Sequence, residues 1–198
     1  MKFYLNDFDK NGKLETIYTY KINGDDYPIH DRDELIKQLP ELKKKLLYYK
    51  DYSVQTINDV FDKDLLLSSY TRYLDETKSL ILLSKGSQSY EIIYMPDEIQ
   101  YSSVHAISIE DVNLDGKKDL ILGGNQFLVK PQFGAYDASK GWIMYGSENS
   151  NKLFDNFKPL NIYGEIRDFS IVTDLKSSDS LILIAGISDS KIITKNVK

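Results

Sequence analysis

The stretch Asp111–Asn125 reads DVNLDGKKDLILGGN and contains the strongest structural signal of the chain. Its first nine residues place oxygen-bearing side chains at alternate positions and a glycine at position 6, and an apolar run follows directly. Ca²⁺ takes about six to eight oxygen ligands, so alternate side chains of a tightly curled loop can surround it. The glycine permits the sharp turn that such a loop requires. The stretch therefore predicts a cation-binding loop that leads into a β-strand.

A second stretch, Asp7–Glu15, reads DFDKNGKLE and aligns with Asp111–Asp119 without a gap. Clustered carboxylates repel one another, so a folded chain that keeps them close usually holds a cation between them. The sequence therefore predicts two calcium sites, with ligands at positions 1, 3, 5, 7 and 9, where position 7 contributes its backbone carbonyl. The expected ligands are Asp7, Asp9, Asn11, Lys13 and Glu15 in the first loop and Asp111, Asn113, Asp115, Lys117 and Asp119 in the second.

These loops admit two other interpretations. Asp, Asn and Gly are also the ordinary residues of solvated turns, and one such loop alone would favour neither interpretation. The recurrence of the same pattern, followed by an apolar strand in both places, favours calcium. An EF-hand needs a glutamate at position 12 and flanking helices. Position 12 is Tyr18 in one loop and Leu122 in the other, and the flanking residues alternate as strands do, so the EF-hand is excluded.

The rest of the sequence predicts a mainly β fold with one helical insertion at about residues 31–62. Short apolar or alternating runs are separated by glycine, asparagine or serine, as in strands joined by turns. A turn is expected at residues 23–26. Strands are expected on both sides of the first loop within residues 3–20, and at residues 79–84, 90–94, 104–109, 119–122, 141–145, 166–173 and 181–185.

The helical insertion carries recognisable start and stop signals. Asp31 is followed three residues later by Glu34, as in a capping box. Leucines at 35, 39, 42 and 46 follow at helical spacing, and Pro40 is expected to divide this run into two short helices. Ser53 is expected to begin a further helix, which carries Val54, Ile57, Val60 and Phe61 on one face.

Composition excludes several classes of function. The net charge of −5 argues against a nucleic-acid partner, because phosphate binding requires a dense basic face. The absence of cysteine excludes disulfides and thiolate zinc sites. No apolar run approaches the roughly 18 residues of a membrane span, and the N-terminus has no apolar segment of the kind that signal peptides contain.

These residues resemble the FG-GAP/VCBS repeat family, which includes the calcium-binding propeller of integrin α subunits. Asp111–Asn125 is similar to bacterial members in which the loop runs into an apolar strand and a Gly-Gly-Asn. Met95–Gln100 resembles the segment that often precedes such a repeat, and Phe133–Gly141 the segment that follows it. The resemblance implies a single domain over residues 1–198, a partial β-propeller of about three to four blades, with the helical insertion.

The chain departs from the family pattern in three places. Glu15 replaces the commoner aspartate at position 9. Residues 174–179, DLKSSD, lie where a third copy is expected but lack the motif, so they are interpreted as a copy that has lost its ion. The blades are fewer than the roughly seven usual in the family. A closed propeller leaves few bare strand edges, so the missing blades, or another chain, are expected at exposed edges here.

The resemblance implies a non-enzymatic calcium-binding module of a secreted or cell-surface protein, acting in adhesion or ligand presentation. A protein or a glycan is the expected ligand. Calcium loops of extracellular modules commonly bind at about 10⁻⁴–10⁻³ M, a range that cytosolic calcium would not fill. Because the chain begins almost on a strand and shows no signal peptide, it is expected to be N-terminally incomplete.

Two other functions stay open at this point. A carbohydrate-acting enzyme, or its accessory lobe, would need a pair of carboxylates in a cleft away from the loops, for which Asp137 and Glu165 are candidates. A degraded copy with no independent role is the third reading. His105 is expected to be a core or half-buried residue of a strand, and Trp142 a core residue.

Overall fold

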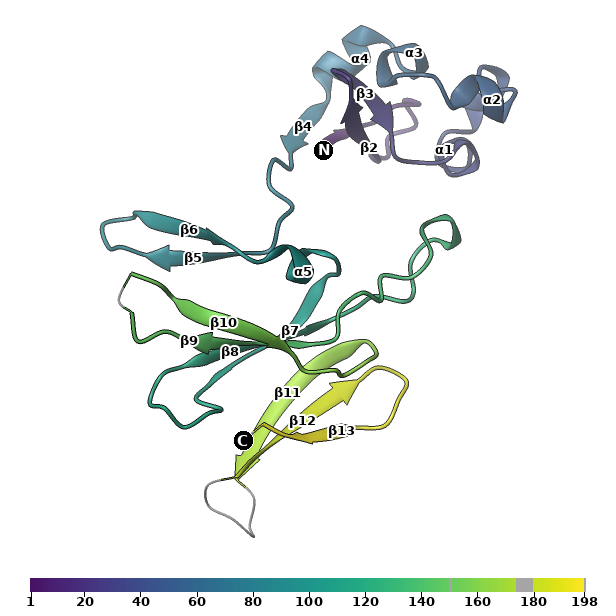
Figure 1. Ribbon diagram of the computed structural model, residues 1–198. Coiled ribbons are helices and arrows are strands. Elements are labelled where there is room, and N and C mark those ends of the chain that lie inside the picture. The colour runs from purple at the N-terminus through teal and green to yellow at the C-terminus, as the bar shows by residue number, and fades with distance from the viewer. Residues whose placement is uncertain (150, 174–179, 198) are drawn as a thin grey trace. The chain divides into compact units, whose positions relative to one another are not determined.

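The computed structural model describes residues 1–149, 151–173 and 180–197. Within these residues the fold is mainly β, with thirteen strands in four antiparallel sheets and only short helices (Figure 1). No closed barrel or propeller is formed by this described part of the chain. Residues 174–179, which were interpreted as a degenerate third loop, lie outside the described residues.

Contacts along the chain define two compact units, Met1–Thr77 and Lys78–Lys198, and each is described by itself. The single domain expected over residues 1–198 stays a prediction, and an unfolding measurement that shows one cooperative transition would support it. No helix within the described residues combines the length and the apolar character that crossing a bilayer requires.

The first unit is one four-stranded sheet with a helical layer. Its strand order is β3-β2-β1-β4, and every neighbouring pair is antiparallel. All the helices of this unit lie between β3 and β4 in the sequence. The elements are β1 (Lys2–Asn6), β2 (Glu15–Ile22), β3 (Asp25–Pro28), α1 (Arg32–Gln38), η1 (Pro40–Lys44), α2 (Tyr49–Tyr52), α3 (Ile57–Val60), α4 (Lys63–Ser68) and β4 (Tyr70–Tyr73).

The helix starts follow local capping chemistry, with one correction. Asp31 forms the expected capping box with Glu34, and Pro40 begins the separate 3₁₀ helix η1. The predicted start at Ser53 is wrong, since Ser53 ends α2. The next helix begins after Thr56, whose hydroxyl and N–H both bond the Asp59 carboxylate, so this box fixes the start three residues later.

The core of the first unit lies between the helices and one face of the sheet. The leucines at 35, 39, 42 and 46 are all buried, as their spacing predicted. They pack with Tyr4 and Ile17, which point to the same side of β1 and β2. Of the four residues expected on one face after Ser53, three are buried, whereas Val54 is exposed because it precedes the helix.

The second unit is built around a four-stranded antiparallel meander with order β10-β9-β8-β7. A separate two-stranded hairpin precedes the meander and a three-stranded sheet follows it. The elements are β5 (Leu80–Ser84), β6 (Tyr90–Tyr94), α5 (Asp97–Gln100), β7 (Val104–Glu110), β8 (Asp119–Gly124), η2 (Pro131–Phe133), β9 (Trp142–Gly146), β10 (Phe154–Pro159), β11 (Ile166–Thr173), β12 (Leu181–Ile187) and β13 (Ile193–Asn196).

Strand β8 is buried along its whole length because the meander has cores on both faces. Leu120 and Leu122 face a core that includes Met95 and Ile99, which flank and form α5. Ile121, which points to the opposite side, lies in a core formed with the β11–β13 sheet. The run Asp119–Leu122 was therefore correctly predicted as a strand, and its continuous apolar character reflects burial from both sides.

Two predictions on single residues of this unit have different outcomes. The expectation that Trp142 is a core residue is confirmed in part: its partly buried ring packs edge-on against Phe157, with ring centroids 5.6 Å apart, against the core that contains Leu122. The expectation for His105 is wrong, because its side chain is exposed. It lies on β7, the edge strand of the meander, and points to the same side as Ile107, which is exposed too.

Candidate metal-binding loops

The first acidic loop connects β1 to β2, so its two ends are held by an antiparallel strand pair. The Asp7 carboxylate accepts hydrogen bonds from the N–H groups of Asn11 at 2.9 Å and Gly12 at 2.8 Å. Asp9 accepts a further bond from the Asn11 N–H at 3.2 Å. At the end of the loop Glu15 accepts a bond from the Phe8 N–H at 2.8 Å. The loop is thus curled around its own carboxylates.

The second loop connects β7 to β8 and repeats this hydrogen-bond pattern position for position. Asp111 accepts from the N–H groups of Asp115 at 3.0 Å and Gly116 at 2.8 Å. Asn113 accepts from the Asp115 N–H at 3.1 Å, and Asp119 accepts from the Val112 N–H at 2.9 Å. Two stretches about a hundred residues apart therefore fold locally in the same way.

The backbone conformation is also shared. Position 4 is in the left-handed region in both loops, with φ of 58° at Lys10 and 59° at Leu114. At position 6, Gly12 and Gly116 both have φ of 86°, which only glycine adopts without strain. The sequence prediction that these glycines serve the sharp turn is consistent with this geometry.

The carboxylates converge in the first loop. One oxygen from each of Asp7, Asp9 and Glu15 lies within 4.8 Å of the others. Because Ca–O distances are about 2.3–2.6 Å, oxygens on opposite sides of one calcium ion lie about 5 Å apart, so this spacing suits a shared ion. The three carboxylates thus form a donor set that a hard divalent cation fits.

No corresponding group of three carboxylates is found in the second loop, within the described residues. Position 3 is the amide Asn113, and the third acid is Asp115 at position 5. The Asp115 carboxylate accepts bonds from the Lys117 N–H at 2.8 Å and the Asn113 amide at 2.6 Å. Both bonds stabilise the charged form, so they lower the pKa of Asp115, the backbone bond contributing most.

The remaining predicted ligands lie at the exposed rim of the loops. Asn11 and Lys13 are both exposed, and the Asn11 side-chain oxygen accepts a bond from the Lys13 N–H at 2.8 Å. Lys117 occupies the equivalent exposed position in the second loop. In both loops the side chain at position 5 therefore accepts a hydrogen bond from the N–H of position 7. The alternation of oxygen-bearing residues in the sequence did not predict this role.

Position 9 differs most between the loops. Asp119 is 0% exposed, and its second oxygen accepts a bond from the Gly146 N–H of β9 at 2.8 Å. Glu15 is 7% exposed and accepts only the bond from Phe8 among the described residues. The longer glutamate arm therefore keeps one oxygen without a protein donor, whereas Asp119 joins its loop to a strand of the same sheet.

Comparisons of the chain with protein-family models, with curated proteins and with solved structures returned no match. The FG-GAP/VCBS resemblance stays a prediction.

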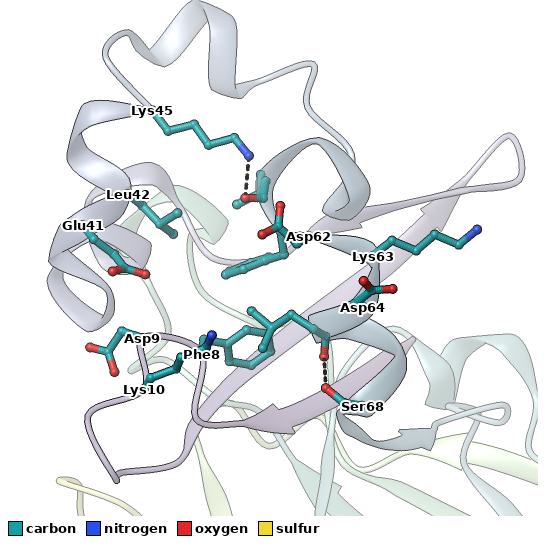
Figure 2. Close-up of a pocket in the computed structure, with 13 residues that line it drawn as sticks. Phe8, Asp9, Lys10, Glu41, Leu42, Lys45, Asp62, Lys63, Asp64 and Ser68 are labelled. Atoms are coloured by element: carbon teal, nitrogen blue, oxygen red, sulfur yellow. Dashed lines mark hydrogen bonds between the residues drawn. The ribbon is translucent and has the colours of Figure 1, made fainter.

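A cavity of about 920 Å³ lies beside the first loop, within the first unit. Figure 2 shows Asp9 and Glu41 on one side of it and Asp62 and Asp64 on the other. Among the described residues, none of these four carboxylates forms an ion pair. The Lys45 ammonium instead donates to the Val60 carbonyl at 3.0 Å. Asp9 belongs both to the acidic cluster of the loop and to the lining of this cavity. A cation bound by Asp9 would therefore add positive charge beside the cavity.

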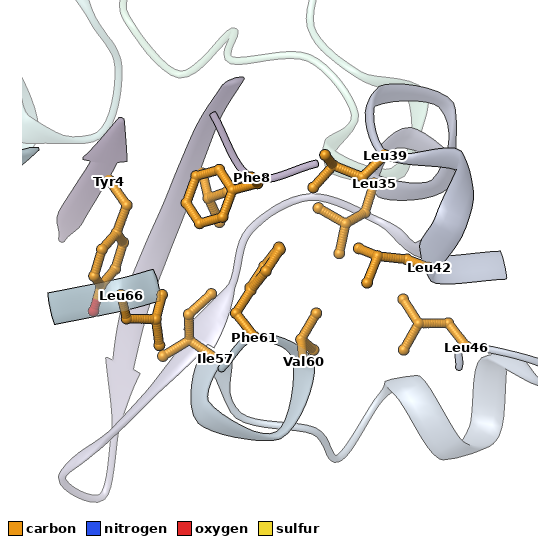
Figure 3. Close-up of a cluster of buried hydrophobic side chains, with 11 residues drawn as sticks. Tyr4, Phe8, Leu35, Leu39, Leu42, Leu46, Ile57, Val60, Phe61 and Leu66 are labelled. Carbon is orange, nitrogen blue, oxygen red and sulfur yellow. The ribbon is translucent and has the colours of Figure 1, made fainter. Parts of the chain in front are cut away.

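The apolar residue at position 2 anchors each loop to its core. Figure 3 shows Phe8 among the buried side chains of the first unit, and its ring lies 4.8 Å from that of Phe61 at a tilt of 50°. Val112, at the same position of the second loop, is fully buried in the core of the second unit. Sequence reasoning missed this position, although an apolar residue between two oxygen-bearing side chains was the available signal.

The carboxylates considered for an enzyme have unlike surroundings. Asp137 is exposed. Glu165 is buried, accepts a bond from the Phe127 N–H at 2.5 Å and pairs with Arg167 at 3.1 Å. Arg167 also donates to the Asn125 carbonyl, so Glu165 belongs to a network that holds the chain after β8. Its contacts are those of a structural ion pair.

Proposed function

We propose that this chain is a non-enzymatic calcium-binding β module in which each acidic loop closes around one Ca²⁺. The observation that carries the proposal is the convergence of Asp7, Asp9 and Glu15. Asp7 directly follows β1 and Glu15 begins β2, so an ion shared by them would join the two strands at their loop end. The matching backbone of the second loop supports extending the proposal to Asp111, with the carbonyls at position 7 as further ligands.

The sheets of the second unit support a propeller-like arrangement as the finer proposal for the fold. The meander β7–β10 consists of consecutive antiparallel strands, as a propeller blade does. Cores lie on both of its faces, one formed with the β11–β13 sheet and one with α5 and the hairpin strand β5. Under this proposal the missing blades, or another chain, would cover the remaining exposed edges.

The proposed setting is extracellular or at a cell surface, with a role in adhesion or ligand presentation. Loops of this kind in extracellular modules bind calcium at about 10⁻⁴–10⁻³ M. If free calcium were 100 times the dissociation constant, each filled site would stabilise the fold by about 2.7 kcal/mol. That is a large part of the roughly 5–15 kcal/mol that stabilises a typical domain, so removal of calcium would markedly lower the stability of the module.

Calcium titration of the full chain tests the proposal. After divalent ions are removed, isothermal titration calorimetry with CaCl₂ should detect two sites, and the thermal midpoint should rise by several degrees. Asp7→Asn should remove the first site, because Asp7 is a ligand whose two oxygens also hold the loop backbone. Asp111→Asn should remove the second site for the same reason.

A matched control is Asp51→Asn, which changes an exposed carboxylate on α2 that is outside both loops. It should leave the calcium stoichiometry and the rise in thermal midpoint unchanged. Absence of binding heat at millimolar calcium, together with an unchanged thermal midpoint, would refute the proposal. A calcium response of equal size in Asp7→Asn and in the parent chain would refute the assignment of the first loop.

A further inference from the structure

The chain contains two Asn-Gly pairs, Asn11–Gly12 and Asn23–Gly24, and both lie in the first unit. In such a pair the glycine nitrogen can attack the side-chain carbonyl carbon of the asparagine, because glycine has no side chain that hinders the approach. The glycine nitrogen loses its proton, a C–N bond forms, and the side-chain nitrogen leaves as ammonia. Water then opens the resulting succinimide ring to aspartate or isoaspartate. Since both pairs share this chemistry, a difference between them comes from the fold.

The first pair occupies positions 5 and 6 of the first acidic loop, where hydrogen bonds hold the reacting groups. The Gly12 N–H donates to Asp7 at 2.8 Å, so the attacking nitrogen is engaged. The Asn11 side-chain oxygen accepts from the Lys13 N–H at 2.8 Å, and its NH₂ group donates to Asp9 at 2.8 Å. Loss of the Gly12 proton would also place a negative charge beside the Asp7 carboxylate, which is unfavourable. The fold therefore opposes the reaction at Asn11.

The second pair forms the turn between β2 and β3. Ile22 pairs with Asp25, so Asn23 and Gly24 are the two residues of a hairpin loop. Their φ values are 51° and 100°, and positive φ at both positions is the type I′ geometry for which Asn-Gly is a preferred sequence. Asn23 is exposed, and in the part of the chain that the structure describes no hydrogen bond holds its side chain or the Gly24 N–H. The fold therefore leaves the reacting groups of this pair unrestrained.

From this contrast we propose that Asn23 is a site of spontaneous deamidation in the folded chain, and that the acidic loop protects Asn11 from the same reaction. The reaction consumes only water and releases ammonia. The protection of Asn11 comes from hydrogen bonds made within the protein, so it requires no bound calcium. This modification site is independent of the calcium-binding function proposed above.

Modification of Asn23 would act on the edge of the first sheet. Both products add a negative charge to a turn that is followed directly by Asp25 and Asp26. Isoaspartate also carries the main chain through its side-chain carbons, so the two-residue turn gains one backbone atom. Within the sheet β3 pairs only with β2, across this turn. We therefore expect the modified chain to hold β3 less firmly.

Prolonged incubation of the full chain at mildly alkaline pH tests the proposal, in EDTA so that only the hydrogen bonds of the protein act. Chymotryptic digestion places Asn11 and Asn23 in different peptides, and mass spectrometry measures the conversion of each to aspartate or isoaspartate. We expect Asn23 to be converted several times faster than Asn11 in the folded chain. In concentrated urea, where neither pair is held, the two rates should become similar.

One variant and one internal control sharpen the test, with circular dichroism to show that both chains are folded. Asp9→Ala removes the acceptor of the Asn11 amide, so it should speed the conversion of Asn11 and leave that of Asn23 unchanged. Asn161 is exposed with φ of 54°, much as Asn23 is, but the bulky Ile162 follows it, so Asn161 should stay unconverted. The proposal is overturned if Asn23 is not converted, or if Asn11 or Asn161 is converted as fast as Asn23 in the folded chain. An unchanged rate at Asn11 in Asp9→Ala would overturn the protective role of that hydrogen bond.

Discussion

The two acidic loops share a backbone and differ in the placement of charge. Both use position 1 to bind the N–H groups of positions 5 and 6, and both place glycine at φ of 86°. The first loop has its acids at positions 1, 3 and 9, and these converge. In the second loop one acid is at position 5, where it caps Lys117, and another is the buried Asp119.

This difference separates two tasks that one motif performs. The curl of the loop depends on side chains that accept backbone hydrogen bonds, a task that an amide and a carboxylate both perform. Holding a divalent ion depends on how many carboxylates converge, which shifts with a single Asp-to-Asn exchange. A loop can therefore keep the full backbone of the motif while one of its carboxylates accepts a hydrogen bond from outside the loop, as Asp119 does from Gly146.

The largest expected contrast is at position 9. Asp119→Ala would leave the buried N–H groups of Val112 and Gly146 without acceptors. Since each unsatisfied group costs about 1–3 kcal/mol, the free energy of unfolding should fall by roughly 2–6 kcal/mol. Glu15→Ala removes one such bond, from Phe8, and should cost about half as much. Urea unfolding in EDTA measures both without a contribution from calcium.

Asp119→Asn serves as the control, because it keeps one acceptor oxygen and should fall between Asp119→Ala and the parent chain. Equal losses for Asp119→Ala and Glu15→Ala would show that the bond to Gly146 contributes nothing, and would remove the main structural difference between the loops.

The next largest contrast is expected from two variants that exchange the charged and neutral side chains at position 3 of the loops. Asn113→Asp gives the second loop a carboxylate where the first loop has Asp9, and Asp9→Asn makes the reverse change. Because calcium affinity rises with ligand charge, Asn113→Asp should tighten the second site by about tenfold, or about 1.4 kcal/mol. Asp9→Asn should weaken the first site by a similar factor. Calorimetric titration of both variants would contradict the comparison if neither affinity moved.

A smaller and equal effect is expected at position 6. A Cβ at Gly12 or Gly116 would meet no atom within 4 Å, so the cost of alanine is limited to its left-handed backbone. That strain is about 1 kcal/mol, and Gly12→Ala and Gly116→Ala should lose nearly the same stability. Thermal unfolding in EDTA compares them, and a clear inequality would mean that the two backbones differ in solution.

The smallest expected effect is on how the stability of the fold depends on pH in the acidic range. The pKa of Asp115 is lowered in the folded chain, so its charged form stabilises the fold above its unfolded pKa of about 3.9, and this contribution is lost as pH falls through the lower folded value. Asn11, the equivalent residue of the first loop, does not titrate. Melting curves in EDTA from about pH 5 downward should therefore show a slightly weaker pH dependence for Asp115→Asn, and a stronger one would contradict the assignment.

Much of the fold could be predicted because its signals are local. The capping box at Asp31 and the helix break at Pro40 each involve residues within one turn, and both were predicted correctly. The expected strands beside the two loops were found as well. Four strands were missed, and each is only four to six residues long. The strands are β3, β4, β10 and β13.

Strand β3 shows why such elements escape sequence reasoning. Its residues include Asp25 and Asp26, which are poor strand formers. These two residues also belong to the segment 23–26, which was predicted as a turn. The strand exists because its backbone pairs with the free edge of β2. Pro28 is tolerated there because an edge strand leaves one row of N–H groups without partners.

The sequence alone determined how the two loops curl, because every bond that shapes them, from Asp7 to Glu15 and from Asp111 to Asp119, is made within nine residues. The tertiary structure decided which strand faces are covered and what position 9 contacts. Burial depends on segments that are distant in sequence, as when Gly146 donates to Asp119 or when His105 is left on an edge strand. A local pattern contains no record of such distant partners.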